Sequence, residues 1–253
     1  MTTSAPDAPL LALFCDFGAA GPYTGQVMAA WAAAAPEIPR LTLFAESPAF
    51  DIEAGAHLLH AFTRTLPPGS VIEAVVDPGV GGARGVVVVR ADGLWFVAPD
   101  NGLLAVVTDR AAECAAWRVD WRPRAAMPQT FHGRDLFAPI AATLARTGAP
   151  PQPCALVAPP ALVRNVANPA FRVILVDPYG NLMIGMGASA LSRGARIGIG
   201  SETVGHAPRF EACPPGEGFW YANANGLLEI AVNRGSAARR FSAAVGTPVR
   251  VLL

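Results

Sequence analysis

The chain has 253 residues, of which 52% are hydrophobic and 15% charged, so it has enough apolar sequence for a large core and is not a disordered protein. Its length predicts one or two domains. The 19 basic residues are all arginine and are balanced by 19 acidic residues, which gives no indication of a nucleic-acid or membrane partner. The absence of lysine excludes Schiff-base chemistry, lysine-containing phosphate-binding loops and protein-kinase catalysis.

The first residues, 1–9, are predicted to form a short polar tail. They lack the positive charge of a signal peptide, and no apolar run approaches the roughly 18–20 residues that a membrane span needs. We therefore expect a cytoplasmic protein. The cysteines at positions 15, 114, 154 and 213 have neither CxxC spacing nor nearby histidines, so we expect reduced thiols and no metal site.

Strand-like and helix-like segments alternate through residues 10–150, which predicts an α/β domain with a largely parallel sheet. The apolar, β-branched segments predict strands at 10–15, 40–45, 71–76, 86–90 and 94–98. The segments with helical spacing or high alanine content predict helices at 25–35, 51–65 and 136–146.

The pattern changes after Gly148, because residues 148–169 contain six prolines and little periodicity. We place a proline-rich linker at 151–169. Short strand-like segments separated by turn residues then recur through residues 170–253, which predicts a smaller, all-β, barrel-like domain.

Three polar residues of the first domain are candidates for a shared catalytic site: Asp77, Arg84 and His132. Asp77 ends an apolar strand and opens a glycine-rich loop that closes with Arg84, while His132 precedes a predicted helix. Strand-end loops of α/β sheets are common ligand sites, and these three residue types can together orient and deprotonate a water molecule. Each residue also has an ordinary interpretation, as a turn aspartate, a surface arginine or a helix-capping histidine.

Two other patterns have simpler interpretations than the cofactor or metal sites they suggest. The glycine-rich loop leads into a strand rather than a helix and lacks the dinucleotide-binding spacing. Glu53, His57 and His60 share one helical face, which would suit a metal, but a partly exposed face of ordinary polar residues is the interpretation we favour.

Seven segments of the chain, taken together, are similar to one enzyme family. They read CDFG at 15–18, FDIEAGAHLL at 50–59, VVDPGVGGARG at 75–85, APDNGLL at 98–104, TFHGRDLFAPIAA at 130–142, VDPYGNL at 176–182 and LLEIAVNRGSAA at 227–238. The chain resembles the S-adenosyl-L-methionine hydroxide adenosyltransferases, or adenosine-forming S-adenosylmethionine hydrolases, which are related to fluorinase and chlorinase. The resemblance runs from about Leu10 to Leu253.

The resemblance implies a two-domain subunit in a homotrimer whose active sites lie between subunits. It also implies a small-molecule substrate: water attacks C5′ of S-adenosylmethionine and releases adenosine and methionine. Asp77, Arg84 and His132 occupy the positions of the family's water-activating residues, and the halogenating relatives lack the aspartate and the histidine. Because a sulfonium is already a good leaving group, we expect no cofactor and no metal.

The resemblance also implies ligand contacts for seven residues. Asp16 matches the ribose-binding aspartate, and a carboxylate suits two hydroxyl donors. The others are Phe50, which packs on the ligand; Asp177 and Asn181, at the methionine end; Tyr179, before the Gly-Asn pair; Tyr221, a ring for adenine stacking; and Ser236, in the loop near the adenine or the carboxylate. Phe50 and Tyr221 could equally be core residues, and Asp177 could belong to a plain turn.

The sequence departs from the family pattern at a few polar positions. Gly21 stands where a second aspartate is usual, the segment from Thr42 to Ala45 lacks an aspartate and a histidine, and Gly185 replaces an asparagine. These changes leave two alternatives open, namely a protein that binds S-adenosylmethionine or adenosine with negligible turnover, and an adenosyltransferase that uses another nucleophile.

Overall fold

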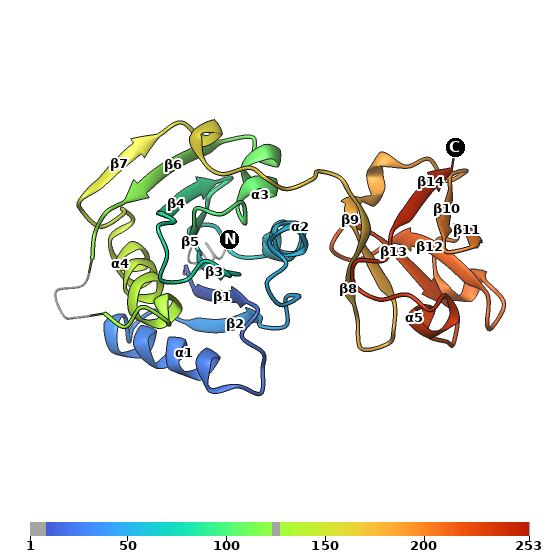
Figure 1. The fold of residues 1–253 in the computed structure, drawn as a ribbon, viewed down its shortest axis with the longest axis horizontal. Coiled ribbons are helices and arrows are strands. Elements are labelled where there is room, and N and C mark those ends of the chain that lie inside the picture. The colour runs from blue at the N-terminus through green and yellow to red at the C-terminus, as the bar shows by residue number, and fades with distance from the viewer. Residues whose placement is uncertain (1–8, 123–126, 253) are drawn as a thin grey trace, which may run out of the picture. The chain divides into compact units, whose positions relative to one another are not determined.

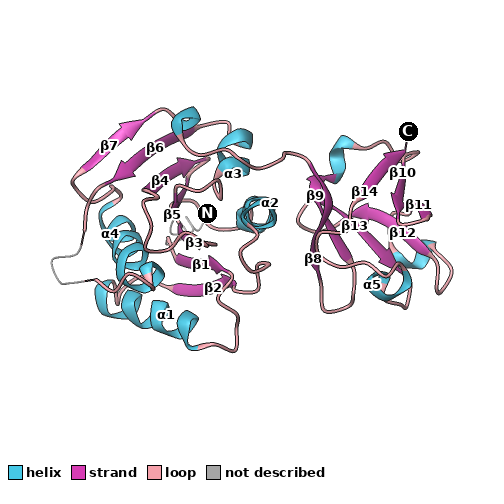
Figure 2. Ribbon diagram, viewed as in Figure 1, coloured by secondary structure: helices cyan, strands magenta, loops and turns pink. Residues whose placement is uncertain are grey.

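The computed structural model describes residues 9–122 and 127–252 (Figure 1). The chain divides between Val166 and Ala167 into two compact units, each with its own sheet, and each is described here by itself. Apart from Pro9, the polar tail predicted for residues 1–9 lies outside the described residues. Figure 2 shows helices flanking the strands of the N-terminal unit and mostly strands in the C-terminal unit.

The described part of the N-terminal unit contains one mixed sheet, with the strand order β2-β1-β3-β5-β4-β6-β7. The pairs along β2-β1-β3-β5 are parallel, and those along β5-β4-β6-β7 are antiparallel. The strands are β1 (Leu11–Cys15), β2 (Arg40–Phe44), β3 (Val71–Val75), β4 (Val86–Ala91), β5 (Leu94–Pro99), β6 (Cys114–Val119) and β7 (Cys154–Val157). The predicted α/β architecture is confirmed, with a sheet that is parallel in one half only.

The antiparallel half begins at a tight hairpin between β4 and β5. Its two turn residues, Asp92 and Gly93, have φ angles of 47° and 82°. Positive φ at both positions is what a type I′ two-residue hairpin turn requires, and Asp-Gly is a favoured pair for it. The hairpin reverses the chain within the sheet, so β4 runs against its neighbours.

Two pairs of helices cover the two faces of this sheet (Figure 1). Helices α1 (Pro22–Ala34) and α4 (Ala138–Thr147) pack against each other on one face, and α2 (Ile52–Thr63) packs against α3 (Ala105–Arg110) on the other. Helix α1 begins three residues before the predicted start, because the fixed φ of Pro22 suits a first helical position. Helix α2 is capped by Asp51, whose Oδ1 accepts a hydrogen bond from the N–H of Ala54 at 2.9 Å.

Part of the range 151–169 that the sequence predicts as a linker pairs with the first sheet. Strand β7 runs antiparallel to β6, with Ala116 opposite Val157 and Val119 opposite Cys154. A strand of only four residues between prolines lacks the alternation that would have marked it in the sequence.

The described part of the C-terminal unit is mostly β-structure, with one sheet that nearly closes on itself in the order β14-β10-β11-β12-β13-β9-β8 and one short α-helix. At the closure, the N–H of Val173 donates to the carbonyl of Thr247 and that of Gly246 donates to the carbonyl of Val173, both at 2.8 Å. The elements are β8 (Ala170–Val176), β9 (Leu182–Gly187), β10 (Arg196–Ile199), β11 (Glu202–His206), β12 (Gly218–Ala222), β13 (Leu227–Val232), α5 (Ala237–Arg240) and β14 (Val249–Leu252). The barrel-like prediction is confirmed.

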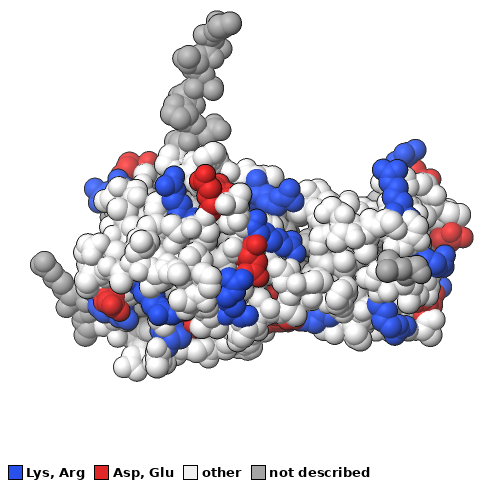
Figure 3. Space-filling view, turned by 90° about the horizontal axis from the view of Figure 1, so that it is seen from above, with Lys and Arg blue, Asp and Glu red and all other residues white. Residues whose placement is uncertain are grey.

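The four cysteines are all free, as expected. No helix in the described ranges is long and apolar enough to cross a membrane. On the face drawn in Figure 3, basic and acidic side chains are interspersed rather than gathered into areas of one sign.

A carboxyl group, that of Glu73, lies fully buried in the centre of the N-terminal sheet. Its Oε2 accepts a hydrogen bond from the indole N–H of Trp31 in α1 at 3.0 Å, while Oε1 has no partner among the described residues. Burial raises the pKa of Glu73 well above its ordinary value of 4.5. The folded protein therefore holds a proton here that the unfolded chain releases.

Because the folded protein must lose this proton at high pH, we expect the free energy of unfolding to fall as the pH rises. Since the folded pKa is the higher one, the stabilisation is complete below about pH 4.5 and is lost as the pH approaches the folded pKa, with a slope of at most ~1.4 kcal/mol per pH unit. Urea unfolding of wild type and Glu73→Gln between pH 5 and 8 measures this, and the amide variant should lose the slope. Equal slopes would contradict the assignment; the exposed Glu113, changed to glutamine, is the control.

Candidate functional site

Two aspartates of the N-terminal unit follow neighbouring parallel strands at the same edge of the sheet. Cys15, the last residue of β1, is opposite Val75, the last residue of β3. Asp16 comes directly after β1 and Asp77 comes two residues after the end of β3, so the sheet places both carboxylates at its C-terminal edge. This is the usual position of ligand sites in α/β sheets.

The glycine-rich loop after β3 returns Arg84 onto Asp77. Turn hydrogen bonds join the N–H of Val80 to the carbonyl of Asp77 at 3.2 Å and the N–H of Gly82 to that of Gly79 at 3.0 Å. Gly81 has a φ of 78°, and a Cβ there would lie 2.6 Å from the carbonyl oxygen of Gln129, so only glycine fits. Glycine at position 81 therefore lets the loop pack closely on the segment that contains Gln129.

Arg84 contacts both other members of the predicted catalytic set. Its Nε lies 3.1 and 3.0 Å from the two carboxylate oxygens of Asp77, and its Nη2 donates to Oδ2. The same Nη2 lies 2.8 Å from Nδ1 of His132. The side chain of Asp77 is 4% exposed and that of Arg84 is 11% exposed, so the ion pair is largely shielded from water.

The contact with Arg84 fixes the protonation of His132. A guanidinium can only donate, so Nδ1 must accept, and the neutral ring carries its hydrogen on Nε2. Burial, and then the charge of Arg84, lower the pKa of His132 below its ordinary value of 6.5. His132 is thus a neutral group that presents an N–H donor.

A π-helical turn, Gly133–Phe137, follows His132 and leads into α4. A Cβ on Gly133 would lie 2.9 Å from Cζ of Phe17, so the glycine lets this turn pack closely on the loop after β1. Such single π turns are frequent at functional sites.

Asp16 is held by the loop that follows β2. Its Oδ2 accepts a hydrogen bond from the N–H of Phe50 at 3.0 Å. The same two loops are joined by hydrogen bonds from Ser47 to the Cys15 carbonyl and from Gly18 to the Ala45 carbonyl. Burial and the nearby charge of Asp77 raise the pKa of Asp16, whereas the Phe50 N–H opposes the shift.

These residues surround one cavity of about 240 Å³ in the N-terminal unit. Asp16, Phe50, Asp77 and His132 line it, and Arg84 contacts two of them. The sequence did not identify the aromatic wall formed by Phe17, Tyr23 and Phe131, whose ring centroids lie 5.2–6.3 Å apart. Their positions next to the predicted site were visible in the sequence, but a pocket aromatic and a core aromatic look alike there.

Phe50 has a strained backbone, with a φ of 64°. Left-handed conformations are unfavourable for residues with a Cβ by about 1–2 kcal/mol, and they cluster at functional sites. The residue is 73% exposed, so burial of the ring in a core does not explain the strain. In this conformation the N–H of Phe50 donates to Asp16 and the Phe50 side chain lines the cavity.

We expect Phe50→Gly to be more stable than Phe50→Ala by about 1 kcal/mol, because glycine adopts a positive φ without strain. Both variants lose the ring and keep the N–H, so the comparison isolates the backbone. Urea unfolding gives the difference. The matched pair at Tyr179, which is exposed and has an ordinary φ, should show the opposite order, and equal stabilities at Phe50 would rule out strain.

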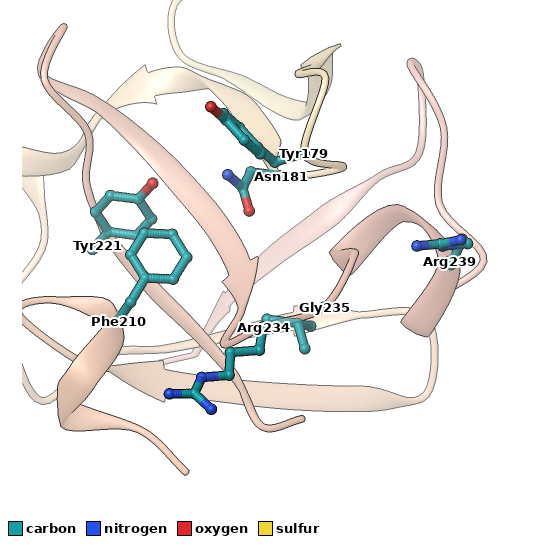
Figure 4. A pocket seen from close by; sticks show the side chains of 8 residues that line it. Tyr179, Asn181, Phe210, Tyr221, Arg234, Gly235 and Arg239 are labelled. Carbon is teal, nitrogen blue, oxygen red and sulfur yellow. The ribbon is translucent and has the colours of Figure 1, made fainter. Parts of the chain in front are cut away.

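A second cavity, of about 590 Å³, lies in the C-terminal unit and is lined by three of the residues predicted to bind ligand, namely Tyr179, Asn181 and Tyr221 (Figure 4). Asp177 fixes the turn between β8 and β9: its Oδ1 accepts from the N–H groups of Tyr179 and Asn181 at 2.9 and 2.8 Å. Its Oδ2 accepts from Nδ2 of Asn181 at 2.9 Å, which orients the amide. Asp177 therefore acts on the cavity through its neighbours.

Further residues of this cavity were not identified from the sequence. Phe210 packs edge-on against Tyr221 with centroids 5.5 Å apart, and Arg234 and Arg239 add positive charge. Ser236 caps α5 by accepting from the N–H of Arg239 at 3.3 Å and packs against Gly180, without lining the cavity. These positions lie in short helical turns and loops, which carry no sequence periodicity.

The departures at positions 21 and 185 have simple structural settings. A Cβ on Gly185 in β9 would lie 2.7 Å from Cβ of Ala170 in β8, so the close approach of the two strands requires glycine. Gly21 is the residue preceding α1. On α2, His57 is buried rather than partly exposed, and in the described ranges no group of three His, Cys, Asp or Glu side chains is arranged to hold a metal.

Known proteins resemble this chain over nearly its full length. Two family models match, the SAM hydroxide adenosyltransferase N-terminal domain over residues 11–153 and the corresponding C-terminal domain over residues 171–250. Relatives named (R)-S-adenosyl-L-methionine hydrolase include one from Thermus thermophilus, 36% identical over 94% of this chain and 97% of its own length. Another, from Salinispora arenicola, is 34% identical over 96% of this chain and 97% of its own length.

Solved structures agree with the fold. An uncharacterized conserved protein from Thermotoga maritima superposes with a TM-score of 0.86 at 26% identity, over 96% of this chain and 100% of that one. A conserved hypothetical protein from Thermus thermophilus gives a TM-score of 0.75 at 32% identity, with the same coverage. The chain belongs to the SAM hydroxide adenosyltransferase family.

Proposed function

We propose that this protein is an enzyme that hydrolyses S-adenosyl-L-methionine to adenosine and L-methionine, and that it acts on the (R) epimer at sulfur, which the names of its relatives specify. The observation that carries the proposal is the contact of Arg84 with both Asp77 and His132, in a cavity that also contains Asp16. The relatives' names support the substrate and the epimer. The contacts among Asp77, Arg84 and His132 support their catalytic roles, and the family resemblance supports the ligand contacts.

The proposed reaction is a displacement at C5′. The water oxygen forms a bond to C5′ as the C5′–S bond breaks, the electron pair goes to sulfur, and methionine leaves as a neutral thioether. One water proton must be removed, and the carboxylate of Asp77 is the acceptor we assign. Because the sulfonium leaves readily, we propose that no cofactor is required.

The water must also be oriented, and Arg84 and His132 each contribute to this orientation. Arg84 holds the Asp77 carboxylate by two donors and keeps Nδ1 of His132 occupied. The Nε2–H of His132 is then free to donate to the water oxygen and hold a lone pair toward C5′. Orientation of this kind is worth up to about 7–11 kcal/mol of the barrier.

In this proposal Asp16 binds the ribose hydroxyls, Phe50 packs on the ligand, and the C-terminal cavity binds parts of the substrate through Tyr179, Asn181 and Tyr221, with Asp177 and Ser236 supporting its loops. The protein would be a homotrimer with active sites between subunits, as the family resemblance implies. Light scattering in solution should then give three chain masses; one mass would contradict the trimer. The cytoplasmic location stays a prediction.

Incubation with each separated epimer of S-adenosylmethionine in ¹⁸O-labelled water, followed by chromatography and mass spectrometry, tests the function. We expect adenosine labelled at its 5′ oxygen, unlabelled methionine and faster turnover of the (R) epimer. No adenosine above an enzyme-free control would overturn the proposal. Calorimetric binding without product would indicate instead a binding protein, the alternative suggested by the missing polar residue at Gly21.

A further inference from the structure

A buried carboxylate of the C-terminal unit accepts hydrogen bonds from two side chains. Glu229 in β13 is 3% exposed and lies directly opposite Tyr221 in the register of β12 and β13. The phenol of Tyr221 donates to Oε1 of Glu229, and Nδ2 of Asn223 donates to Oε2 at 2.8 Å. The catalytic proposal gives Glu229 no role.

This pairing sets the direction of the hydrogen bond that Tyr221 makes. Burial raises the pKa of Glu229 above its ordinary value, whereas the hydrogen bonds from Tyr221 and Asn223 oppose that shift by favouring the ionised form. An ionised carboxylate accepts at both oxygens, so the single phenol hydrogen of Tyr221 is used on Glu229. What Tyr221 Oη then offers to the cavity is its lone pairs.

The side-chain amide of Asn223 cannot flip so that its oxygen, rather than its nitrogen, faces Glu229. Its Oδ1 already accepts from the N–H groups of Asn225 and Leu227, each at 3.0 Å, within the turn that joins the two strands. The amide nitrogen therefore stays toward Glu229. The residue at position 229 must accept at both of its terminal atoms, which glutamate can do and glutamine, whose second terminal atom is an NH2 donor, cannot.

Building on the proposed function, we propose that Glu229 is a positioning residue that makes Tyr221 a hydrogen-bond acceptor, so that the ligand group seated against its oxygen is an N–H donor. S-adenosylmethionine has two such groups, the exocyclic amine of the adenine and the ammonium of the methionine. The side chain of Asn181 supports the proposal, because its donation to Asp177 leaves Oδ1 of Asn181 as a second acceptor in the same cavity.

Glu229→Gln is expected to reverse the direction. The new amide oxygen accepts from Asn223, and the new amide nitrogen donates to the phenol oxygen of Tyr221. The phenol hydrogen of Tyr221 is then released toward the cavity, which would favour a ligand acceptor over a ligand donor. A near-isosteric change thus predicts altered selectivity rather than a general loss of binding.

The hydrogen bond can be tested without any ligand, by alkaline titration of tyrosine absorbance in a Tyr23→Phe, Tyr179→Phe background. Burial and the bond to Glu229 raise the pKa of Tyr221 above its ordinary value of 10. Because removing the negative charge favours phenolate, Glu229→Gln should lower this pKa. Titration at the same pH in both proteins would overturn the assigned bond, whether or not the protein is a hydrolase.

Selectivity is measured by calorimetry with two ligand pairs, adenosine against inosine and L-methionine against its 2-hydroxy analogue. In one pair we expect wild type to prefer the amino compound by about tenfold or more, and Glu229→Gln to reduce that ratio to about threefold or less. The pair that changes identifies the group against Tyr221. In a Tyr221→Phe background, Glu229→Gln should not alter the ratio further.

Failure of this inference is distinguishable from failure of the proposed function. If wild type hydrolyses S-adenosylmethionine and both selectivity ratios survive Glu229→Gln within twofold, the inference fails and the function stands. If wild type releases no adenosine, the function fails and the tyrosine titration still decides whether Glu229 holds the phenol hydrogen. Thermal unfolding of Glu229→Gln and Tyr221→Phe verifies that these variants are folded.

Discussion

His132→Ala is expected to lower kcat for S-adenosylmethionine hydrolysis by roughly 10²–10⁴-fold, with little change in KM. The reason is geometric: His132 is fixed as a donor by Arg84 and lines the cavity together with Asp77, so in the proposed reaction it holds the water rather than the nucleoside. His132→Gln keeps an N–H donor and should retain more activity than His132→Ala. Steady-state kinetics on the three proteins measures the effect.

Asp77→Asn should produce a loss of similar size, because the amide keeps the shape and removes the proton acceptor. The double variant with His132→Ala should lose far less than the product of the single losses, since the two side chains and Arg84 form one hydrogen-bonded unit. Asp120→Asn, at an exposed position, is the matched control. A His132→Ala rate within threefold of wild type, about 0.65 kcal/mol in the barrier, would refute the assignment.

The pH profile gives a second measure of the same unit. The pKa of His132 lies below 6.5, so the ring is neutral at pH 7 and kcat should fall only at more acidic pH. Protonation would place a hydrogen on Nδ1 opposite the Arg84 guanidinium and break the contact. Loss of activity centred above pH 6.5 would argue against this tautomer.

Asp16→Ala is expected to weaken adenosine binding by about 2 kcal/mol or more, roughly 30-fold, because a charged acceptor for the ribose hydroxyls is lost. The fold should survive, since Asp16 lies just beyond the end of β1 and the freed N–H of Phe50 is at an exposed position. Calorimetry with adenosine measures the change.

2′-Deoxyadenosine and 3′-deoxyadenosine separate this role from a general effect on the cavity. Wild type should bind both more weakly than adenosine, and Asp16→Ala should bind all three nucleosides almost equally. Unchanged affinity of the variant for adenosine would refute the ribose role. Phe50→Gly keeps the N–H toward Asp16 and removes the ring, so it measures the separate contribution of the Phe50 ring to nucleoside binding.

The sequence by itself determined the two-part fold and the family. The change from alternating helices and strands to closely spaced strands marks the two units, because helices and strands have different hydrophobic periods. Strand-end carboxylates followed by glycines predicted the edge of the sheet at which Asp77 lies, since such loops are local features. His132 was a candidate for the same site from its residue type and position, the family resemblance added Asp16, and all three line one cavity.

Other features could not be obtained from local pattern. The alternation of strands and helices predicts the parallel half of the sheet. It does not predict the antiparallel half, which begins at the hairpin turn formed by Asp92 and Gly93, although Asp-Gly is a recognised hairpin pair. Strand β7 was assigned to a linker, because four residues between prolines carry no periodicity and only pairing with β6 makes them a strand.

Only the tertiary structure decided which groups donate and which accept. His132 is a donor because Arg84, 48 residues earlier in the chain, occupies its other nitrogen. Tyr221 is an acceptor because Glu229, on the neighbouring strand, takes its hydrogen. A residue's type determines which hydrogen bonds it can make, so the sequence by itself identifies the available donors and acceptors. Which of them donates and which accepts depends on neighbours that folding brings close, so only the tertiary structure decides the direction of each hydrogen bond.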